Sequence, residues 1–240
     1  MRRTGAHEKD WRPMTLKTIM VLLVGTCAML LLMLILMKLY RVKMWKGLPT
    51  AFTLTITGTI STYIWFFVEN SWFGGRSYYG AVFLVPLAFI YVAKLMHIPY
   101  GELMDFCAPS ECVMLAIMKH QCLIDGCCAG KVLLSIAADG SVVFPSQIAE
   151  LINALAIMVV LMALAFLKKY KGKLYAWYLV IYGGTRFILN FLRADTTPLL
   201  LGLPVGNLWS LLAIFIGIMW LTDRKLVIVK NISREEQISD

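Results

Sequence analysis

Long apolar runs, separated by short polar segments, divide this chain of 240 residues almost from end to end. An α-helix needs ~20 consecutive apolar residues to cross the ~30 Å hydrocarbon layer of a membrane. Five runs have this length and character, and they cover residues 18–37, 48–68, 78–96, 147–167 and 203–222. Each of these runs predicts one membrane-spanning helix.

Two further runs carry ionisable side chains inside them. Residues 106–124 contain Glu111, Lys119 and His120, and residues 174–192 contain Arg186. Such groups are costly at membrane depth and usually face the protein or a water-filled interior. We therefore interpret both runs as spans that line a site. The predicted fold class is all-α, a polytopic membrane protein with about seven transmembrane helices.

The composition excludes a soluble domain. Hydrophobic residues make up 60% of the chain and charged residues 15%, whereas soluble domains carry roughly a quarter charged residues. The net charge of +9 would suit a nucleic-acid binder, but the basic residues cluster between the apolar runs, as membrane-flanking cations do. We predict one membrane domain and no nucleic-acid partner. The domain comprises a polar tail at 1–17, a helix bundle at 18–222 and a cytoplasmic tail at 223–240.

The distribution of basic residues predicts the orientation. With seven spans, the segments on one side carry 13 lysines and arginines, and those on the other side carry 3, plus 5 in the amino-terminal tail. Because cytoplasmic loops are enriched in these residues, we expect the 13 in the cytoplasm and the amino terminus outside, although the tail's own charge opposes this. We expect the first run to be retained, because it is too long for a signal-peptide core and lacks a small-residue cleavage site.

A dense group of polar and sulfur-bearing residues, HQCLIDGCCAGK at residues 120–131, lies at the outer end of the fourth span and extends into the longest loop, residues 125–146. Its glycines allow a tight turn whose backbone amides attract anions, which favours a phosphate-binding loop. The alternative is an ordinary helix end on glycine. A metal, disulfide or other thiol function is a further interpretation, although adjacent cysteines cannot easily bind one ion together. Its ligands would be His120, Cys122, Cys127 and Cys128.

The fifth span opens with FPSQIAE, residues 144–150. Proline and serine ahead of an apolar run are an ordinary helix start. Gln147 and Glu150 lie three positions apart and therefore share a face. They either line a site or simply occupy the first turn, where the helix dipole favours a carboxylate.

The sixth span carries a polar stripe. Four residues recur at helical spacing and so share one face, namely Tyr182, Arg186, Asn190 and Arg193. An arginine facing lipid would be unfavourable, so the stripe should face the bundle, and the glycine pair at 183–184 should let another helix approach. Arg186 is the strongest functional candidate in the chain. The alternative for it is a buried ion pair with Glu111 or Glu150.

A fourth motif, GGRSYYG at residues 74–80, opens the third span and includes Tyr79. Tyrosines at this position are also typical of the aromatic belt at the membrane surface. In the predicted topology all four motifs meet at the outer face of the membrane. This convergence predicts a site for an anionic lipid of the outer leaflet and for a second substrate from outside.

These motifs resemble those of the prolipoprotein diacylglyceryl transferase family, whose members are seven-helix bacterial membrane enzymes. The resemblance covers roughly residues 21–221 and rests on GCCAGK, FPSQIAE and YGGTRFILNFLRAD in that order. In addition, KLMHIPYGELMDFCAP is similar to the family's cytoplasmic loop ending in D-x-x-A-P, and GNLWS is similar to the G-Q-x-L-S at the start of its last helix. The resemblance implies a multi-pass protein of the bacterial cell membrane.

The resemblance also implies an activity. The family transfers the diacylglyceryl group of phosphatidylglycerol to a cysteine thiol of a lipoprotein precursor, which forms a thioether and releases glycerol phosphate. Such a reaction needs a thiolate to attack a glycerol carbon and cations to hold the phosphate. The implied catalytic residues are Arg186, Tyr182, Tyr79 and Lys119. The implied substrate-binding residues are Gly126, Cys122, Asp125, Gln147, Glu150, Asn190 and Arg193. No metal or cofactor is implied.

Several positions depart from the family's motifs. Lys119 stands where R-x-G-N-F-x-N-G begins with arginine, and a lysine cannot bind two phosphate oxygens side by side. The two asparagines of that motif are Cys122 and Asp125 here. The motif histidine before the third helix is Tyr79, a poor base at neutral pH, and Asn190 replaces a glutamate. Two alternatives therefore stay open, namely a non-catalytic lipid-binding relative and the membrane thiol or metal protein.

Overall fold

The computed structural model describes residues 16–71, 75–128, 130–136, 140–167, 169–194, 198–200 and 203–222. The predicted tails lie outside these ranges, except for the last two residues of the amino-terminal one, which belong to the first helix.

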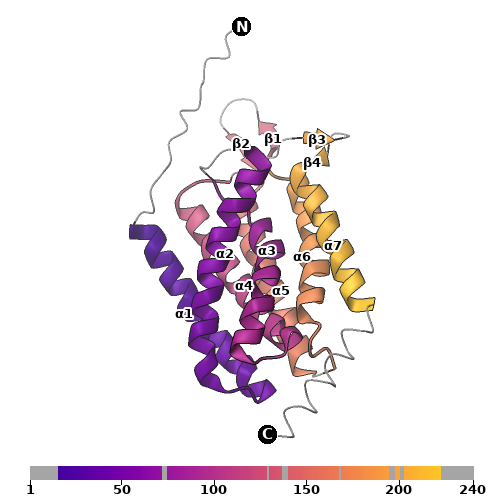
Figure 1. The fold of residues 1–240 in the computed structure, drawn as a ribbon. Coiled ribbons are helices and arrows are strands. Elements are labelled where there is room, and N and C mark those ends of the chain that lie inside the picture. Colours follow the sequence, from indigo (N-terminus) through magenta and orange to yellow (C-terminus); the bar gives the residue numbers. More distant parts are fainter. Residues whose placement is uncertain are drawn as a thin grey trace, which may run out of the picture.

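Seven long helices and two short hairpins make up the described chain (Figure 1). The helices are α1 (Leu16–Tyr40), α2 (Gly47–Asn70), α3 (Tyr79–Met96), α4 (Tyr100–Ile124), α5 (Ser146–Phe166), α6 (Leu174–Phe191) and α7 (Val205–Thr222), and a short 3₁₀ turn, η1 (Met44–Lys46), precedes α2. Between α4 and α5, β1 (Val132–Ile136) pairs with β2 (Gly140–Val143) in antiparallel fashion. Between α6 and α7, β3 (Pro198–Leu200) pairs with β4 (Leu203–Pro204).

Every apolar run identified in the sequence forms a helix, which confirms an all-α polytopic membrane protein. Among the described residues, five helices are long and apolar enough to cross a membrane, namely α1, α2, α3, α5 and α7. The other two, α4 and α6, are the runs with internal charges. The hydrophobic pattern placed the start of α4 at residue 106, whereas the helix begins at Tyr100. It also gave no indication of the two hairpins.

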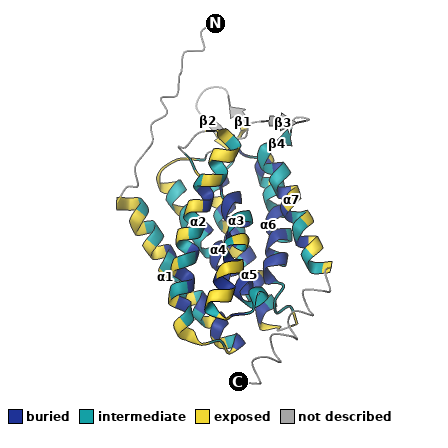
Figure 2. Cartoon of the chain, in the orientation of Figure 1, coloured by how far each residue is buried: buried dark blue, intermediate teal, exposed yellow. Residues whose placement is uncertain are grey.

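The bundle surrounds the charged helices. α4 contacts α1, α3, α5 and α6, and its residues 103–112 are all buried. Exposed positions lie on the outer faces of the bundle, for example along α1, α2 and α7 (Figure 2). Both hairpins lie at one end of the bundle (Figure 1). The charges inside α4 and α6 are therefore carried by helices with protein neighbours, as their cost in lipid requires.

The close approach of α6 and α7 depends on one glycine of the predicted pair. A Cβ atom at Gly183 would lie 2.8 Å from the backbone oxygen of Ser210, which is too short for any side chain. Gly184 has no atom within 4 Å of the corresponding position. The prediction that residues 183–184 admit a neighbouring helix is thus correct for Gly183 and wrong for Gly184, because the second glycine faces away from α7.

Asp105 fastens the end of the bundle opposite the hairpins. Its buried carboxylate accepts hydrogen bonds from the backbone nitrogens of Gly172 at 2.5 Å and Leu174 at 2.8 Å. It also accepts one from the Tyr40 hydroxyl at 3.0 Å. Because these donors belong to α1 and to the start of α6, one side chain in α4 joins three helices.

Replacing Asp105 by alanine is expected to destabilise the protein clearly more than the Tyr40→Phe control. The alanine leaves buried donors unsatisfied, at about 1–3 kcal/mol each, whereas Tyr40→Phe removes a single bond. Thermal unfolding in detergent, followed by circular dichroism, measures both variants. Equal melting temperatures for the two variants would show that Asp105 does not have this fastening role.

Candidate functional site

Three basic side chains from two helices and a helix end converge on one buried carboxylate. Glu150 lies in the first turns of α5 and is only 3% exposed. Its Oε2 lies 2.6 Å from Lys119 Nζ and 2.5 Å from Arg186 Nη1, and its Oε1 contacts the guanidinium of Arg193. Glu150 balances only one of the three positive charges. The cluster therefore keeps a positive charge that attracts an anion.

The sequence left two partners open for Arg186, and the structure selects Glu150. Glu111 lies elsewhere in α4, where the Tyr175 hydroxyl donates to its Oε2 at 3.5 Å. Among the described residues, the buried Nε of Arg186 has no hydrogen-bond partner. The ion pair with Glu150 thus does not use all of the guanidinium donors.

The cations line a cavity of about 1020 Å³ at the hairpin end of the bundle. Its walls come from α1, α2, α4, α6 and the starts of α3 and α7. The cavity is large enough to hold a lipid headgroup. Eight of the residues predicted for the site line it, namely Tyr79, Lys119, Cys122, Asp125, Tyr182, Arg186, Asn190 and Arg193. The other three, Gly126, Gln147 and Glu150, support residues of the wall rather than form it.

Tyr79 joins three helices at the cavity wall. Its hydroxyl lies 2.8 Å from both the Gly206 backbone oxygen and Ser210 Oγ in α7, and Asn190 Nδ2 of α6 donates to it at 3.4 Å. The ring of Tyr182 packs edge-on against that of Tyr79, with centroids 6.3 Å apart. These contacts fix the positions of both rings and of Asn190.

Side chains at the start of α5 form hydrogen bonds to the loop that follows α4. Gln147 Nε2 donates to the Cys127 carbonyl at 2.6 Å, and the Ser146 hydroxyl donates to the Cys128 carbonyl. Gly126 turns the chain here with a φ of 66°. Asp125 accepts a hydrogen bond from Gln121 Nε2 at 2.9 Å. The turn is thus the end of α4, held in place by the start of α5, and phosphate binding by it stays a prediction.

The same loop also positions Arg193. Gly130 pairs with Arg193 in an isolated antiparallel bridge, and the Lys131 nitrogen donates to the Leu192 carbonyl at 2.8 Å. The end of α6 is thereby held against the segment between α4 and α5. This pairing brings a cation from beyond α6 next to Lys119 and Glu150.

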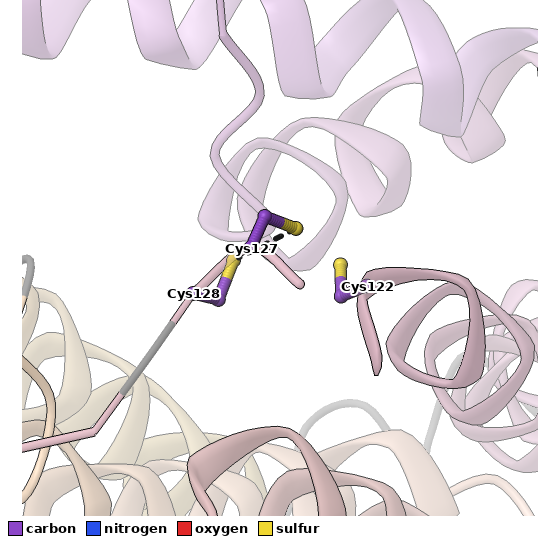
Figure 3. Close-up of side chains that lie close together, drawn as sticks. All are labelled: Cys122, Cys127 and Cys128. Atoms are coloured by element: carbon purple, nitrogen blue, oxygen red, sulfur yellow. Dashed lines mark hydrogen bonds between the residues drawn. The ribbon is translucent and has the colours of Figure 1, made fainter. Parts of the chain in front are cut away.

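Three thiols lie close together in and after the last turn of α4 (Figure 3). The Sγ atoms of Cys122, Cys127 and Cys128 all lie within 4.8 Å of one another. A hydrogen bond from the Cys122 thiol lowers the pKa of Cys128 to about 5, and the charges of Lys119 and Arg193 act in the same direction, while burial opposes them. Burial raises the pKa of Cys127. The group does not include His120, so the predicted set of four soft ligands is reduced to three.

The chain matches one known protein family over most of its length. The family model of prolipoprotein diacylglyceryl transferase matches residues 18–222. The chain belongs to this family. It is an integral bacterial membrane protein, and its resemblance to the family is confirmed.

Three relatives of this chain are 29–31% identical to it where the sequences align. They are named phosphatidylglycerol–prolipoprotein diacylglyceryl transferase. The protein of Geobacter sulfurreducens is 30% identical over 142 residues, which cover 56% of this chain and 54% of the relative. That of Methylobacillus flagellatus is 29% identical over 160 residues, 62% and 61% of the two chains. That of Campylobacter curvus is 31% identical over 157 residues, 60% and 56%. The chain thus spans little more than half the length of these relatives.

Two charged residues that line the cavity were not among the site residues predicted from the sequence. Arg76 lines the cavity and lies over the ring of Tyr63, 5.5 Å from its centroid. Glu69 lines it from the end of α2. Arg76 belongs to GGRSYYG, in which only the tyrosines were considered as site residues. Glu69 follows directly after the apolar run at residues 48–68. A search for charges at the ends of spans would have identified both.

Proposed function

We propose that the protein transfers the diacylglyceryl group of phosphatidylglycerol to a cysteine thiol of a lipoprotein precursor. The observation that carries this proposal is the convergence of Lys119, Arg186 and Arg193 on the single carboxylate of Glu150 at the cavity wall. A phosphodiester carries one negative charge, so it can bind there without exceeding the positive charge that Glu150 leaves uncompensated. Family membership and the relatives' names support the same activity.

The chemistry follows from the charges at the wall. The acceptor thiol loses its proton to solvent, and the thiolate attacks the glycerol carbon that bears the phosphate. A carbon–sulfur bond forms as the carbon–oxygen bond breaks, and glycerol phosphate leaves with the electron pair. Negative charge grows on the departing phosphate, where Arg186 and Lys119 stabilise it. Tyr79, Tyr182 and Asn190 orient the headgroup.

We further propose seven membrane spans, with the amino terminus outside and the carboxyl terminus in the cytoplasm. The excess of lysine and arginine in the segments opposite the hairpins supports this orientation. It places the cavity, both hairpins and the thiols at the outer face of the membrane. There the lipid of the outer leaflet and an exported precursor both have access to the site.

The decisive experiment uses purified protein, labelled phosphatidylglycerol and a lipobox peptide. We expect a thioether-linked diacylglyceryl peptide by mass spectrometry, together with an equal amount of released glycerol phosphate. A peptide with serine in place of the acceptor cysteine is the control and should give neither product. Binding of phosphatidylglycerol without any product would contradict the transferase and identify the protein as a lipid-binding relative.

A further inference from the structure

The thiol group has the dimensions of a metal site. The Sγ atoms of Cys127 and Cys128 are 3.7 Å apart, and all three sulfurs lie within 4.8 Å of one another. Zinc binds cysteine sulfur at about 2.3 Å with tetrahedral geometry, which separates two sulfur ligands by about 3.8 Å. The spacing between Cys122 and Cys127 leaves four intervening residues, which is within the range of zinc sites.

Adjacent cysteines were not expected to bind one ion together easily, but the sulfurs of this pair lie 3.7 Å apart, and the backbone gives the reason. Cys128 has a φ of 61°, in the left-handed region that non-glycine residues rarely adopt. This turn places its sulfur beside that of Cys127 (Figure 3). Such a conformation is costly and persists only where its surroundings hold it.

Hydrogen bonds from the start of α5 and within the turn hold Cys127 and Cys128 in this conformation. Ser146 and Gln147 bind the carbonyls of Cys128 and Cys127, and the Cys127 nitrogen donates to the Cys122 carbonyl at 3.1 Å. The three thiols are therefore arranged before any ion binds. All of them line the cavity, so a fourth ligand can reach the same ion from there.

We propose that Cys122, Cys127 and Cys128 form a three-thiolate site for Zn²⁺, with the fourth coordination position open to the cavity. Three thiolates and one Zn²⁺ carry a net charge of −1. Lys119 lies one helical turn before Cys122, and Lys119 and Arg193 line the same cavity as the three thiols, so the positive cluster balances this charge. Three protein ligands with an open fourth position are the arrangement of catalytic zinc sites, whereas structural sites are closed by four.

The open position gives the ion a role that rests on the proposed transferase function. The acceptor cysteine of the lipoprotein precursor takes the fourth position and loses its proton to solvent, because a thiol bound to zinc is deprotonated outright. The zinc thiolate then attacks the glycerol carbon, and glycerol phosphate leaves with the electron pair of the broken carbon–oxygen bond. Zinc thus supplies the thiolate, while Arg186 and Lys119 receive the leaving phosphate.

Metal binding is measured first, without reference to activity. The protein is purified in detergent with reductant, stripped with a chelator and titrated with Zn²⁺ against a chromogenic chelator. We expect one Zn²⁺ per chain. Replacing Zn²⁺ by Co²⁺ should give sulfur-to-cobalt charge-transfer absorption and the intense visible bands of tetrahedral Co²⁺. A protein that binds no Zn²⁺ under these reducing conditions would overturn the site.

Variants localise the ion. Cys122→Ser and Cys128→Ser should each weaken Zn²⁺ binding by at least about 100-fold. Losing a residue that only supports a metal ligand costs up to about 100-fold in affinity, and losing a ligand itself should cost at least as much. Cys27→Ser, at an exposed thiol in α1, is the matched control and should bind as the unaltered protein does. Unchanged Zn²⁺ affinity in Cys122→Ser would refute the site, and melting temperatures measured without metal show whether each variant is folded.

The role of the fourth position has its own readout. A lipobox peptide with cysteine should change the Co²⁺ spectrum, and the serine peptide should not. Removing Zn²⁺ should lower the transfer rate without weakening phosphatidylglycerol binding, and adding Zn²⁺ should restore it. Full transfer without metal would overturn the role of zinc and leave the transferase standing. Zinc bound with no product under any condition would leave the metal site standing and overturn the transferase.

Discussion

Arg186→Ala is expected to lower the rate of diacylglyceryl transfer by about 10²–10³-fold, the usual effect of removing one group that stabilises charge in a transition state. Arg186 lines the cavity and contacts Glu150 through Nη1, and its buried Nε has no hydrogen-bond partner among the described residues. Because the side chain lines the cavity, a phosphate bound there can contact the guanidinium. The measurement is thioether formation from phosphatidylglycerol and a lipobox peptide.

Two further variants separate the role of Arg186 from general effects of charge. Lys94→Ala removes an exposed cation from the last turn of α3, at the end of the bundle away from the cavity, and should leave the rate unchanged. Arg186→Lys keeps the charge but loses the planar, two-pronged donor geometry, so its rate should fall between those of the alanine variant and the unaltered protein. Equal rates for Arg186→Ala and Lys94→Ala would contradict a role in binding the phosphate.

The helices could be predicted from the sequence because each one depends on the residues of its own segment. An apolar run of the right length must form a helix in a membrane, where no other partner satisfies its backbone. The ionisable groups in α4 and α6 likewise indicated burial, which the structure confirms for Glu111, Lys119 and Arg186, whereas His120 is exposed. The start of α4 at Tyr100 was missed because residues 100–105 pack inside the protein, where Asp105 binds the start of α6, and not in lipid. Hydropathy does not distinguish such a segment from a loop.

The site was predictable as a set of residues but not as an arrangement. The spacing of Tyr182, Arg186 and Asn190 depends only on helix geometry, so one sequence sufficed to place them on a face. That Glu150 receives three cations depends on how α4, α5 and α6 are rotated about their axes, which no local pattern encodes. The neighbouring sulfurs of Cys127 and Cys128 depend on a rare backbone conformation that another helix stabilises.

Glu150→Gln is expected to destabilise the protein by about 3–5 kcal/mol, the cost of removing one partner from a buried ion pair. The three basic groups then lie together without a carboxylate between them. Thermal or denaturant unfolding in detergent measures the loss. Glu102→Gln is the matched control, because its pair with Lys171 at 2.8 Å is the more exposed one and should contribute no more than about 1 kcal/mol.

A second substitution and an added anion test whether repulsion between the cations causes this loss. Glu150→Gln combined with Lys119→Met removes one of the three charges and should recover part of the stability. Phosphatidylglycerol added to the micelles should stabilise Glu150→Gln more than the unaltered protein, because its phosphate takes the place of the missing carboxylate. If the lipid stabilised both proteins equally, it would be binding away from Lys119, Arg186 and Arg193. That result would separate the cationic cluster from the lipid site even if the cluster proved essential for folding.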